Sequence, residues 1–476
     1  MFIGGEKYTP SHAETFDVVN PATGELIESV SAASFDDVEK AVCSCAAAFK
    51  PWSRKSYAER AAVLSGISAV LKQKNNLEKL AVLLTKEQGK PLFESRREIE
   101  GVIGVIDYFT GLSSSFHTDF FENKNNQSYS FTLKKPLGVC VSVLPWNMPA
   151  LILSWQTIPA LLTGNTCLVK PSSICPLTVL ELAVLFHHAG LPPGVFNVVT
   201  GSGGKIGKQL ASSPDIHKIS FTGSVDAGRS LGAEAAKYGK RITLELGGSD
   251  AMIVCDDADV RGCASKAVQA KFFNGGQACI SPKRVFVFES VFDEFVQTVL
   301  ESVSKIRLGN GLSEETSMGP LSSAGGQNQM IEWTASAKTE GSKILAGGSV
   351  PKGDEFKDGY FFEPTVITNV SPFSRLLKEE IFGPIMIINP VKDLDEAISE
   401  ANKSDFGLGA SVWTNDMRRA KKGFEELEAG IVWVNQHTKV LPELPFGGIK
   451  NSGFGRVNGY EALNDYLETK TVVFKF

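Results

Sequence analysis

The sequence predicts an α/β protein with two units that each contain a parallel β-sheet. In the first half of the chain, short β-rich runs are each followed by a stretch compatible with a helix. The same alternation resumes after Glu245. Two further extended runs, 129–134 and 470–476, stand apart from both units. Alternation of this kind favours parallel sheets that are covered by helices on both faces.

The first unit is expected to begin with helices. Ser34 precedes an apolar run that has acidic residues in its first turn, and residues 57–72 continue with helical periodicity. These features are typical of helix starts. The strands expected after them are 139–144, 166–170, 195–199 and 218–221.

Residues 136–169 carry no charged side chain, which is also a feature of membrane-spanning segments. However, Pro145 and Pro149 interrupt the segment, and prolines at this spacing break a continuous helix. A buried strand over 138–144, a loop and a buried helix over about 150–162 explain it better. We therefore expect no membrane partner.

The second unit repeats the alternation of strands and helices. Helices are expected over about 291–306 and 394–401. The isolated runs 129–134 and 470–476 need partners, so we expect them to pair with each other or with another subunit. The strands expected in the second unit are 251–254, 284–288, 385–389 and 411–413.

Composition and charge limit the function classes. The 476 residues suffice for two or three domains, and 43% apolar with 21% charged residues is typical of a globular protein. A net charge of −5 and a pI near 5.8 give no electrostatic footprint for nucleic acid. The N-terminus shows no export or transit peptide, and irregularly spaced cysteines favour a reducing cytoplasm. No Cys or His spacing indicates a metal site.

Cys279 is the candidate nucleophile among eight cysteines, because it alone follows a glycine-pinched stretch, residues 272–278. A thiolate is a strong nucleophile, whereas most cysteines are small buried apolar residues. The sequence does not decide whether Cys175 and Cys263 are buried. Burial is expected for those in strand-like or helical segments: Cys43, Cys45, Cys140, Cys167 and Cys255.

Glu245 lies in a second glycine-pinched apolar segment, residues 244–248. A carboxylate among apolar residues can have its pKa raised toward the range that suits a general base. Together, Cys279 and Glu245 fit the formation of a thioester and its hydrolysis. Taken alone, Glu245 is better interpreted as a partly buried, paired acid.

Several further motifs, in one order along nearly the whole chain, resemble those of the aldehyde dehydrogenase superfamily. Any one of these strings could occur by chance, but their shared order and spacing could hardly do so. Besides the segments around Cys279 and Glu245, they are Pro145-Trp146-Asn147, Lys170-Pro171-Ser172, Phe221-Thr222-Gly223-Ser224, Glu380-Ile381-Phe382-Gly383-Pro384 and Pro445-Phe446-Gly447-Gly448.

The resemblance implies an NAD(P)-dependent oxidation of an aldehyde to its acid in a homodimer or homotetramer. It also implies a Rossmann-like cofactor domain, a second α/β catalytic domain and a small β oligomerisation arm. We expect residues 1–118 and 139–246 in the cofactor domain, 247–440 in the catalytic domain, and 119–138 with 456–476 in the arm.

The resemblance also implies roles for the catalytic residues. Cys279 attacks the aldehyde carbon, and the oxyanion accepts hydrogen bonds from the Asn147 amide and the Cys279 backbone N–H. Hydride leaves for the cofactor, and Glu245 activates the water that hydrolyses the thioester. From the residues alone, Asn147 is equally well interpreted as the cap of a helix that starts at Met148-Pro149.

The cofactor contacts follow in the same way. Gly223 and Ser224 come after a strand and open a helix, where backbone N–H groups and the helix dipole hold a pyrophosphate. The run 201–207 lacks the usual dinucleotide spacing and is expected to form a turn near the adenine. The full set implied by the resemblance is Pro145, Trp146, Lys170, Ser172, Ser173, Gly203, Gly223, Ser224, Glu380 and Phe382.

Within that set, Glu380 is expected on the nicotinamide ribose, Phe382 beside the ring and Lys170 on the adenosine ribose. The alternatives are a solvated strand end for Lys170 and a core aromatic for Phe382. Ser173 stands where strictly NAD-using members often carry glutamate. Serine neither accepts from the ribose 2′-hydroxyl as strongly nor repels a 2′-phosphate, so the cofactor is NAD or NADP.

The motifs look most like the bacterial succinate-semialdehyde dehydrogenase branch. That branch commonly has arginine where Trp155 stands, and an indole offers an apolar wall instead of a cation for a carboxylate. The substrate is therefore succinate semialdehyde or a neutral aliphatic or aromatic aldehyde. His437 or Lys439 could supply the missing charge, and Trp155 could equally be core packing. The substrate-contacting residues are expected to be Trp155, Ala278, Ile280 and Phe446.

Two other function classes remain at this point. A coenzyme A-acylating dehydrogenase would pass the thioester to a thiol, and such members tend to lack the glutamate that is present here as Glu245. A non-catalytic binding or structural homologue would keep the fold without the chemistry.

Overall fold

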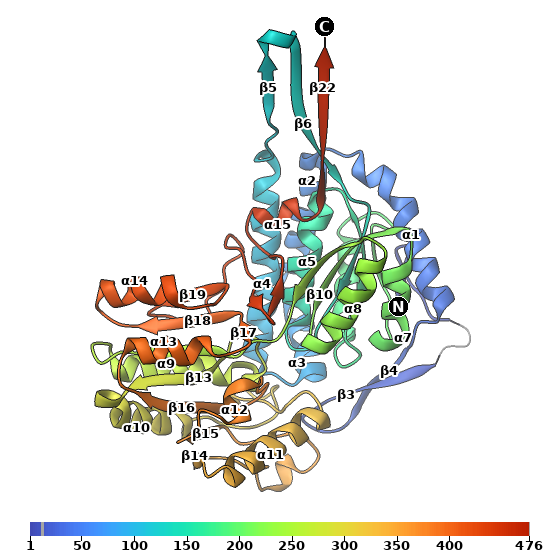
Figure 1. The fold of residues 1–476 in the computed structure, drawn as a ribbon. Helices are drawn as coiled ribbons and strands as arrows, with labels where there is room; N and C mark the ends of the chain where they lie inside the picture. The colour runs from blue at the N-terminus through green and yellow to red at the C-terminus, as the bar shows by residue number, and fades with distance from the viewer. Residues whose placement is uncertain (11–13, 476) are drawn as a thin grey trace.

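The computed structural model describes residues 1–10 and 14–475, and it contains two open sheets side by side and a projecting arm (Figure 1). The first sheet has the order β2-β1-β9-β8-β7-β10-β11-β21. Its neighbours β9, β8, β7, β10 and β11 are all parallel, as the alternation predicted. The strands are β1 (Phe2–Ile3), β2 (Glu6–Lys7), β7 (Val139–Val143), β8 (Thr166–Lys170), β9 (Phe196–Val198), β10 (Ile216–Thr222), β11 (Arg241–Glu245) and β21 (Gly453–Phe454).

Helices cover both faces of this sheet. Ser34 and Asp37 form a reciprocal capping box at the start of α1, which explains why the helix begins there. The apolar segment after β7 becomes α5, which is buried along nearly its whole length. The helices of this part are α1 (Phe35–Ser53), α2 (Tyr57–Leu71), α3 (Lys74–Gln88), α4 (Leu92–Gly111), α5 (Pro149–Leu162), α6 (Leu177–His188), α7 (Gly203–Ser212) and α8 (Val225–Lys237).

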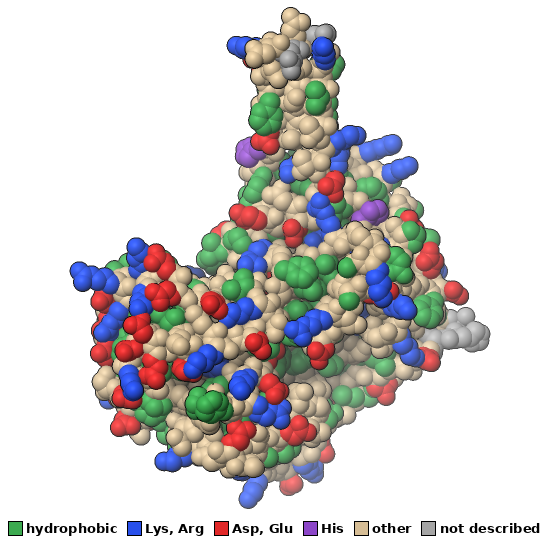
Figure 2. All heavy atoms as spheres, in the orientation of Figure 1, with side chains coloured by type: hydrophobic (Ala, Val, Ile, Leu, Met, Phe, Trp, Pro, Cys, Tyr) green, Lys and Arg blue, Asp and Glu red, His purple; other side chains and the backbone are tan. Residues whose placement is uncertain are grey.

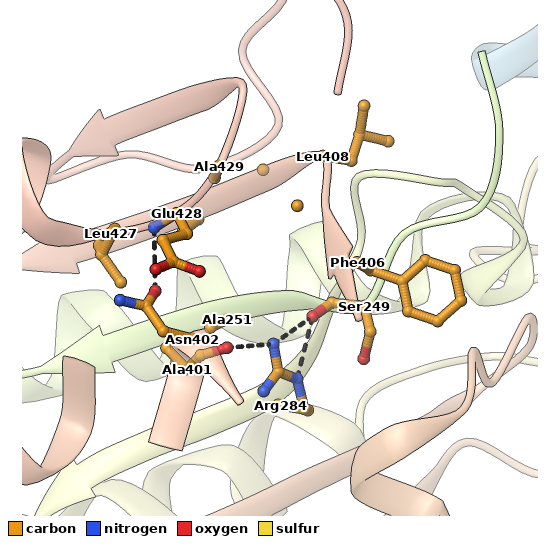
Figure 3. Close-up of a pocket in the computed structure, with 13 residues that line it drawn as sticks. Ser249, Ala251, Arg284, Ala401, Asn402, Phe406, Leu408, Leu427, Glu428 and Ala429 are labelled. Atoms are coloured by element: carbon orange, nitrogen blue, oxygen red, sulfur yellow. Dashed lines mark hydrogen bonds between the residues drawn. The ribbon is translucent and has the colours of Figure 1, made fainter. Parts of the chain in front are cut away.

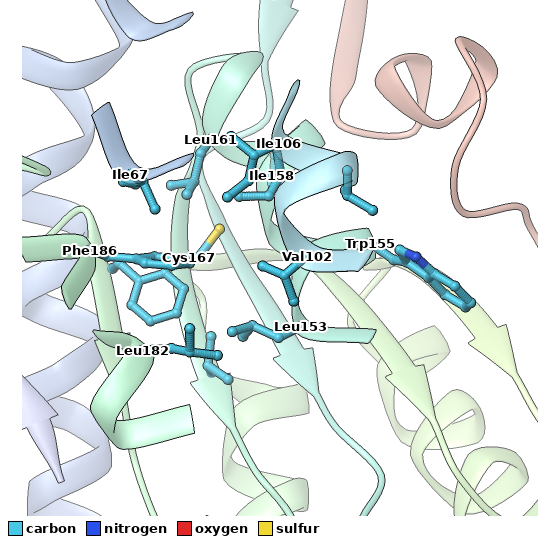
Figure 4. Close-up of a cluster of buried hydrophobic side chains, with 14 of the residues drawn as sticks. Ile67, Val102, Ile106, Leu153, Trp155, Ile158, Leu161, Cys167, Leu182 and Phe186 are labelled. Carbon is cyan, nitrogen blue, oxygen red and sulfur yellow. The ribbon is translucent and has the colours of Figure 1, made fainter. Parts of the chain in front are cut away.

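The largest core lies where α2, α4, α5 and α6 meet the sheet. Figure 4 shows Ile106, Ile158, Leu161 and Phe186 converging there, with Trp155 at the margin of the cluster. Within residues 1–10 and 14–475, no helix is long and apolar enough to cross a membrane.

The second sheet has the order β14-β15-β16-β13-β12-β18-β19 and is parallel except for its edge strand β14. The expected strands and helices of this unit are confirmed. Its strands are β12 (Asp250–Val254), β13 (Pro282–Phe288), β14 (Lys343–Ala346), β15 (Thr365–Thr368), β16 (Ile385–Val391), β18 (Gly409–Trp413) and β19 (Ile431–Val434). Its helices are α9 (Val260–Phe272), α10 (Phe292–Val303), α11 (Ala324–Thr339), α12 (Arg375–Lys378), α13 (Leu394–Asn402) and α14 (Met417–Glu426).

The arm is a three-stranded antiparallel sheet of β22 (Leu467–Lys475), β6 (Ser128–Pro136) and β5 (Phe120–Asn123). β22 and β6 pair along their whole length, from Leu467 opposite Pro136 to Lys475 opposite Ser128. The two isolated runs therefore pair with each other, as one of the two expectations had it, and Phe476 lies outside the described residues. Figure 1 shows the arm extending away from both sheets, and α15 (Glu461–Asn464) precedes it.

Two expectations are wrong, and two small parts of the fold were not expected. Cys43 is exposed although burial was expected, because Cys45, two residues further along α1, occupies the buried face. Gly203 opens α7, so only the beginning of the run 201–207 is a turn. The unexpected parts are two small pairs of strands, β3 (Thr15–Val19) with β4 (Leu26–Ser31) and β17 (Phe406–Gly407) with β20 (Ile449–Lys450).

Candidate active site

Most of the sequence-predicted site residues follow the carboxyl ends of four neighbouring parallel strands. Asn147 follows β7, Lys170 ends β8, Gly223 follows β10 and Glu245 ends β11. Ligands of open parallel sheets bind beyond this edge. The fold therefore places residues that are far apart in the sequence along one edge of the first sheet.

The loop that carries Cys279 joins α9 to β13 through a tight turn over Phe273–Gly276. Asn274, Gly275 and Gly276 all have left-handed backbone angles, with φ of 52°, 61° and 74°. A Cβ at Gly276 would overlap the carbonyl group of Gly383. Glycine is therefore required where the nucleophile loop contacts the Glu380–Pro384 motif.

Cys279 is half-buried, and burial raises the pKa of its thiol to about 12. The Lys283 ammonium acts in the opposite direction. It donates hydrogen bonds to the carbonyl oxygens of Ala278 at 3.1 Å and Cys279 at 2.8 Å. Cys279 is therefore a neutral thiol at pH 7 in this state, and a base must take its proton before it can attack.

The Glu245 carboxyl group is buried and, among the residues that the structure describes, neither of its oxygens has a hydrogen-bond partner. Burial raises the pKa of Glu245 well above its usual value, and Arg456 opposes the shift. The charge of Glu245 also raises the pKa of Cys279, so the two groups are electrostatically coupled. The paired-acid interpretation of Glu245 is thus wrong, because its oxygens remain free to bind water.

Backbone contacts hold the segment that follows Glu245 against the second sheet. The buried Arg284 on β13 donates to the carbonyl oxygens of Ser249 and Ala401 (Figure 3). This anchors the residues between β11 and β12 next to the strand that follows the Cys279 loop. Arg284 therefore links the segment after Glu245 to the strand that follows Cys279.

Asn147 is buried, and its side-chain Nδ2 donates to the carbonyl oxygen of Gln277 at 3.0 Å. Its own carbonyl oxygen accepts from Lys90 Nζ at 2.6 Å and from Asn274 Nδ2 at 3.0 Å. The capping interpretation of Asn147 is wrong, since α5 has Met148 at its N-cap and no side-chain cap hydrogen bond. The Asn147 amide instead lies against the loop that carries Cys279.

The carboxylate of Glu98 fills the capping role at α5. It accepts from the backbone N–H groups of Ala150 and Leu151 at 2.9 and 3.1 Å, and it pairs with Lys90 at 2.6 Å. Both side chains of this ion pair are fully buried. No local pattern in the sequence indicates Lys90, Glu98 or Asn274, although together they hold the Asn147 backbone in place.

Lys90→Met is expected to lower the free energy of unfolding by about 3–5 kcal/mol, because Glu98 would remain as an unpaired buried charge. Lys72→Met removes an ion pair to Asp107 whose side chains are 54% and 47% exposed, and it should cost at most about 1 kcal/mol. Urea denaturation of both variants measures the difference. Equal losses would show that the buried pair has no special structural role.

Residues at the expected cofactor edge fit a dinucleotide. Lys170 is buried, which lowers its pKa to about 8, and it makes no ion pair with any described residue. The solvated-strand-end interpretation of Lys170 is therefore wrong. Its Nζ lies 3.6 Å from where a Cβ of Gly203 would be. Ser224 is the N-cap of α8 and makes no side-chain cap bond, so the first N–H groups of α8 can receive a phosphate.

The Glu380 motif lies between the two sheets. The Glu380 carboxylate accepts from the Gly248 N–H at 2.8 Å and lies 3.6 Å from Lys283 Nζ, while burial raises its pKa. Phe382 is half-buried and packs edge-to-face on Trp146, with ring centroids 5.5 Å apart. The core-aromatic interpretation of Phe382 is therefore wrong, since part of the ring remains exposed.

A cavity of about 670 Å³ lies beside the nucleophile. Trp155 is 8% exposed and packs on Phe446 at 4.9 Å, so it belongs to both the core and the cavity wall. Glu245 lies outside the lining, close to Gly447, the residue after Phe446. The lining includes all the predicted substrate residues, together with Asn147 and Cys279: Trp155, Ala278, Ile280 and Phe446.

His437 also lines the cavity, but it cannot supply a positive charge there. Burial lowers the pKa of His437 to about 3, so its ring is neutral at pH 7. Its Nε2 is 3.0 Å from the Ile280 carbonyl oxygen, so this nitrogen carries the proton and donates. Lys439, the other candidate, is exposed and lines the cavity.

Comparison with known proteins agrees with this geometry. The model of the aldehyde dehydrogenase family matches residues 8–472. A betaine aldehyde dehydrogenase from Staphylococcus aureus in complex with NAD+ superimposes with a TM-score of 0.96 at 35% identity, covering 100% of this chain and 94% of that one. A point mutant of that enzyme, with NAD+ and a BME-modified cysteine, has the same score and identity, covering 100% and 95%.

A putative aldehyde dehydrogenase from Burkholderia cenocepacia is 36% identical, with a TM-score of 0.96 over 99% of this chain and 96% of that one. The family match spans nearly all of the chain, and the similar structures share its fold from end to end. The chain therefore belongs to the aldehyde dehydrogenase family and is an NAD(P)-dependent aldehyde dehydrogenase.

Proposed function

We propose that the protein oxidises an aldehyde to its carboxylic acid with Cys279 as nucleophile, Asn147 as oxyanion donor and Glu245 as general base. One observation carries the proposal. Cys279 and Asn147 line one cavity, and the unpartnered Glu245 carboxyl group is close enough to influence the thiol pKa. This arrangement supplies a nucleophile, a donor and a base for the same substrate carbon.

In the first step, ionised Glu245 accepts the thiol proton and the Cys279 sulfur bonds to the aldehyde carbon. The carbonyl π electrons move onto oxygen, where the Asn147 Nδ2–H and the Cys279 backbone N–H stabilise the charge. When bound, NAD(P) supplies the acceptor for the hydride that leaves this carbon. Glu245 then passes the thiol proton to solvent, so in the last step it can take a proton from water, whose oxygen attacks the thioester carbon. The Cys279–carbon bond breaks with its electron pair on sulfur, and Glu245 returns its proton to give the thiol and the free acid.

The cofactor is proposed to lie along the carboxyl edge of the first sheet. The N–H groups that follow Gly223 and Ser224 hold the pyrophosphate, and Glu380 accepts from the nicotinamide ribose hydroxyls. Trp146 and Phe382 flank the nicotinamide end beside Pro145. Lys170, Ser172, Ser173 and Gly203 line the adenosine end, where Ser173 Oγ donates to the Gly201 carbonyl oxygen at 3.2 Å.

The KM for NADP is expected to rise relative to the KM for NAD as the pH rises through about 8. Burial lowers the pKa of Lys170 to about 8, so below this pH its ammonium is charged and attracts a 2′-phosphate. Above it, the amine is neutral and still binds a ribose hydroxyl. Steady-state kinetics from about pH 6.5 to 9, a range that spans the pKa of Lys170, measure the ratio of the KM for NADP to the KM for NAD. In Lys170→Met the ratio should no longer change at this pH, and an unchanged profile would contradict the assignment.

The wall beside Cys279 favours an aldehyde whose first carbons are apolar. Trp155 and Phe446 line the cavity with two aromatic rings 4.9 Å apart, and these rings offer no cation to the carboxylate of a short semialdehyde, so succinate semialdehyde is the weaker of the expected substrates. Betaine aldehyde, named for the similar enzymes from Staphylococcus aureus, is a further candidate. An aliphatic or aromatic chain next to the carbonyl suits these two rings best.

Product analysis with and without coenzyme A tests the proposal against its main alternative. Hydrolysis gives the free acid without coenzyme A, and the free Glu245 carboxyl group supports this route. An absolute requirement for coenzyme A would contradict it. If none of the aldehydes tested led to NADH formation, only the non-catalytic alternative would remain.

We also propose that the arm joins copies of the chain into a homodimer or homotetramer. β5 and β22 are the two edges of its sheet, and Phe120 and Phe121 on β5 are 62% and 59% exposed. Figure 2 shows the arm standing clear of the body of the molecule. Exposed strand edges with apolar side chains are sites of strand addition. A monomer mass in light scattering would contradict this proposal.

A further inference from the structure

The cavity beside Cys279 is larger than a short aldehyde needs. Its volume of about 670 Å³ lies in the range of pockets that enclose ligands of drug size. The buried side chains Trp155, Ala278 and Phe446 surround the part near the nucleophile. This inner part is apolar, so it suits a chain of several carbons.

The charged residues of the lining are three cations and two acids, and only the cations lack compensation. Arg97, Lys266 and Lys439 form no ion pair with any described residue. Glu98 is neutralised by Lys90 at 2.6 Å. Burial raises the pKa of Glu94 to about 8, so that acid is protonated at pH 7. The cavity therefore carries a net positive charge at neutral pH.

The three cations lie at the outer end of the cavity. Arg97, Lys266 and Lys439 are exposed, whereas the lining residues Trp155, Ala278 and Phe446 are buried. Lys266 lies on α9, seven residues before Phe273, the lining residue that directly follows this helix. That separation corresponds to about 10 Å along a helix axis. The cavity wall thus changes from apolar near the thiol to cationic near the solvent.

We propose that the substrate is an ω-oxo carboxylate, with an apolar chain of several carbons between the aldehyde and a distal carboxylate. The aldehyde lies at Cys279, the chain packs against Trp155 and Phe446, and the carboxylate lies among Arg97, Lys266 and Lys439. This inference rests on the proposed function, since it takes Cys279 as the reacting group. The inference also excludes a cationic aldehyde as the preferred substrate, because the same three residues would repel its positive charge.

Matched pairs of aldehydes test the inference. We expect kcat/KM for 6-oxohexanoate to exceed that for hexanal by about tenfold at low ionic strength, and the preference should shrink as salt is added. Betaine aldehyde should be the poorest of the three, and succinate semialdehyde should fall below 6-oxohexanoate because its carboxylate cannot pass the aromatic wall.

The variant Arg97→Gln, Lys266→Gln, Lys439→Gln should bring the ratio of 6-oxohexanoate to hexanal close to one. Arg261→Gln is the matched control, because Arg261 is an exposed residue of α9 that pairs with Glu294 and does not line the cavity. It removes one positive charge from α9, the helix that carries Lys266, and should keep the ratio.

Each outcome discriminates. Oxidation of hexanal with no preference for 6-oxohexanoate, or a preference that survives in the triple variant, would overturn this inference and leave the proposed function intact. Preferred turnover of betaine aldehyde would do the same. Failure to oxidise any aldehyde would overturn the proposed function and, with it, the inference.

Discussion

Cys279→Ala is expected to lower aldehyde-dependent NADH formation by at least about a thousandfold, because no covalent intermediate can form without the sulfur. Steady-state assays with a saturating aldehyde measure the loss. Cofactor binding should persist, since Cys279 lies in the cavity and most of the proposed cofactor residues follow the carboxyl ends of strands in the first sheet.

Cys43→Ala is the matched control, because Cys43 is an exposed cysteine on α1, outside the cavity lining. It should keep full activity. The assignment of the nucleophile would be wrong if Cys279→Ala retained a substantial fraction of the wild-type rate.

Glu245→Gln is expected to release about one NADH per subunit in a rapid burst and then to turn over about a hundredfold or more slowly. Glutamine has nearly the same shape as glutamate but cannot accept a proton from water, so the thioester would accumulate. Stopped-flow absorbance measures both phases. A steady-state rate equal to that of the wild type would contradict the role of Glu245.

The pH profile gives an independent check of the same residue. Burial raises the pKa of Glu245 well above its usual value, so the base is protonated and inactive below that raised pKa. The wild-type kcat should therefore rise as the pH increases through that raised pKa. Glu245→Gln should lack this rise. If the variant had the same pH profile as the wild type, the rise would have to be assigned to another group.

Local chemistry was sufficient to predict the main elements of the fold. The capping box of Ser34 with Asp37 fixed the start of α1, and short apolar runs marked the parallel strands. The hairpin of β3 and β4 was not predicted, because most of its side chains are exposed or half-buried on both faces. Alternation between apolar and polar residues is weak in such strands.

The sequence predicted the residues that we propose to react, but it did not predict the residues that support them. Lys90 looks like a surface lysine in the sequence, and its burial depends on Glu98 and on the carbonyl of Asn147, 57 residues away. Asn274 connects to Asn147 across 127 residues. Such contacts exist only after the helices have packed, so no local pattern contains them.

The charge of His437 could not be predicted from the sequence either, because it depends on burial in the folded chain. As a loop residue it was a candidate cation, but the folded chain buries it between Ser411 and the Ile280 carbonyl, and burial lowers its pKa to about 3. The charge that does face the cavity comes from Arg97 and Lys266 on α4 and α9 as well as Lys439. The sequence does not show that these three cations share one cavity, because they come together only when α4, α9 and the segment that contains Lys439 have packed.

In the proposed mechanism, oxidation passes through a thioester on Cys279 that Glu245 helps to hydrolyse. Peptide mass spectrometry of Glu245→Gln, quenched with acid after brief mixing with NAD+ and an aldehyde, tests it most directly. We expect the peptide that contains Cys279 to gain the mass of the acyl group on close to one site per subunit. A burst of NADH with no acyl group on that peptide, or with the acyl group on another cysteine, would contradict the claim.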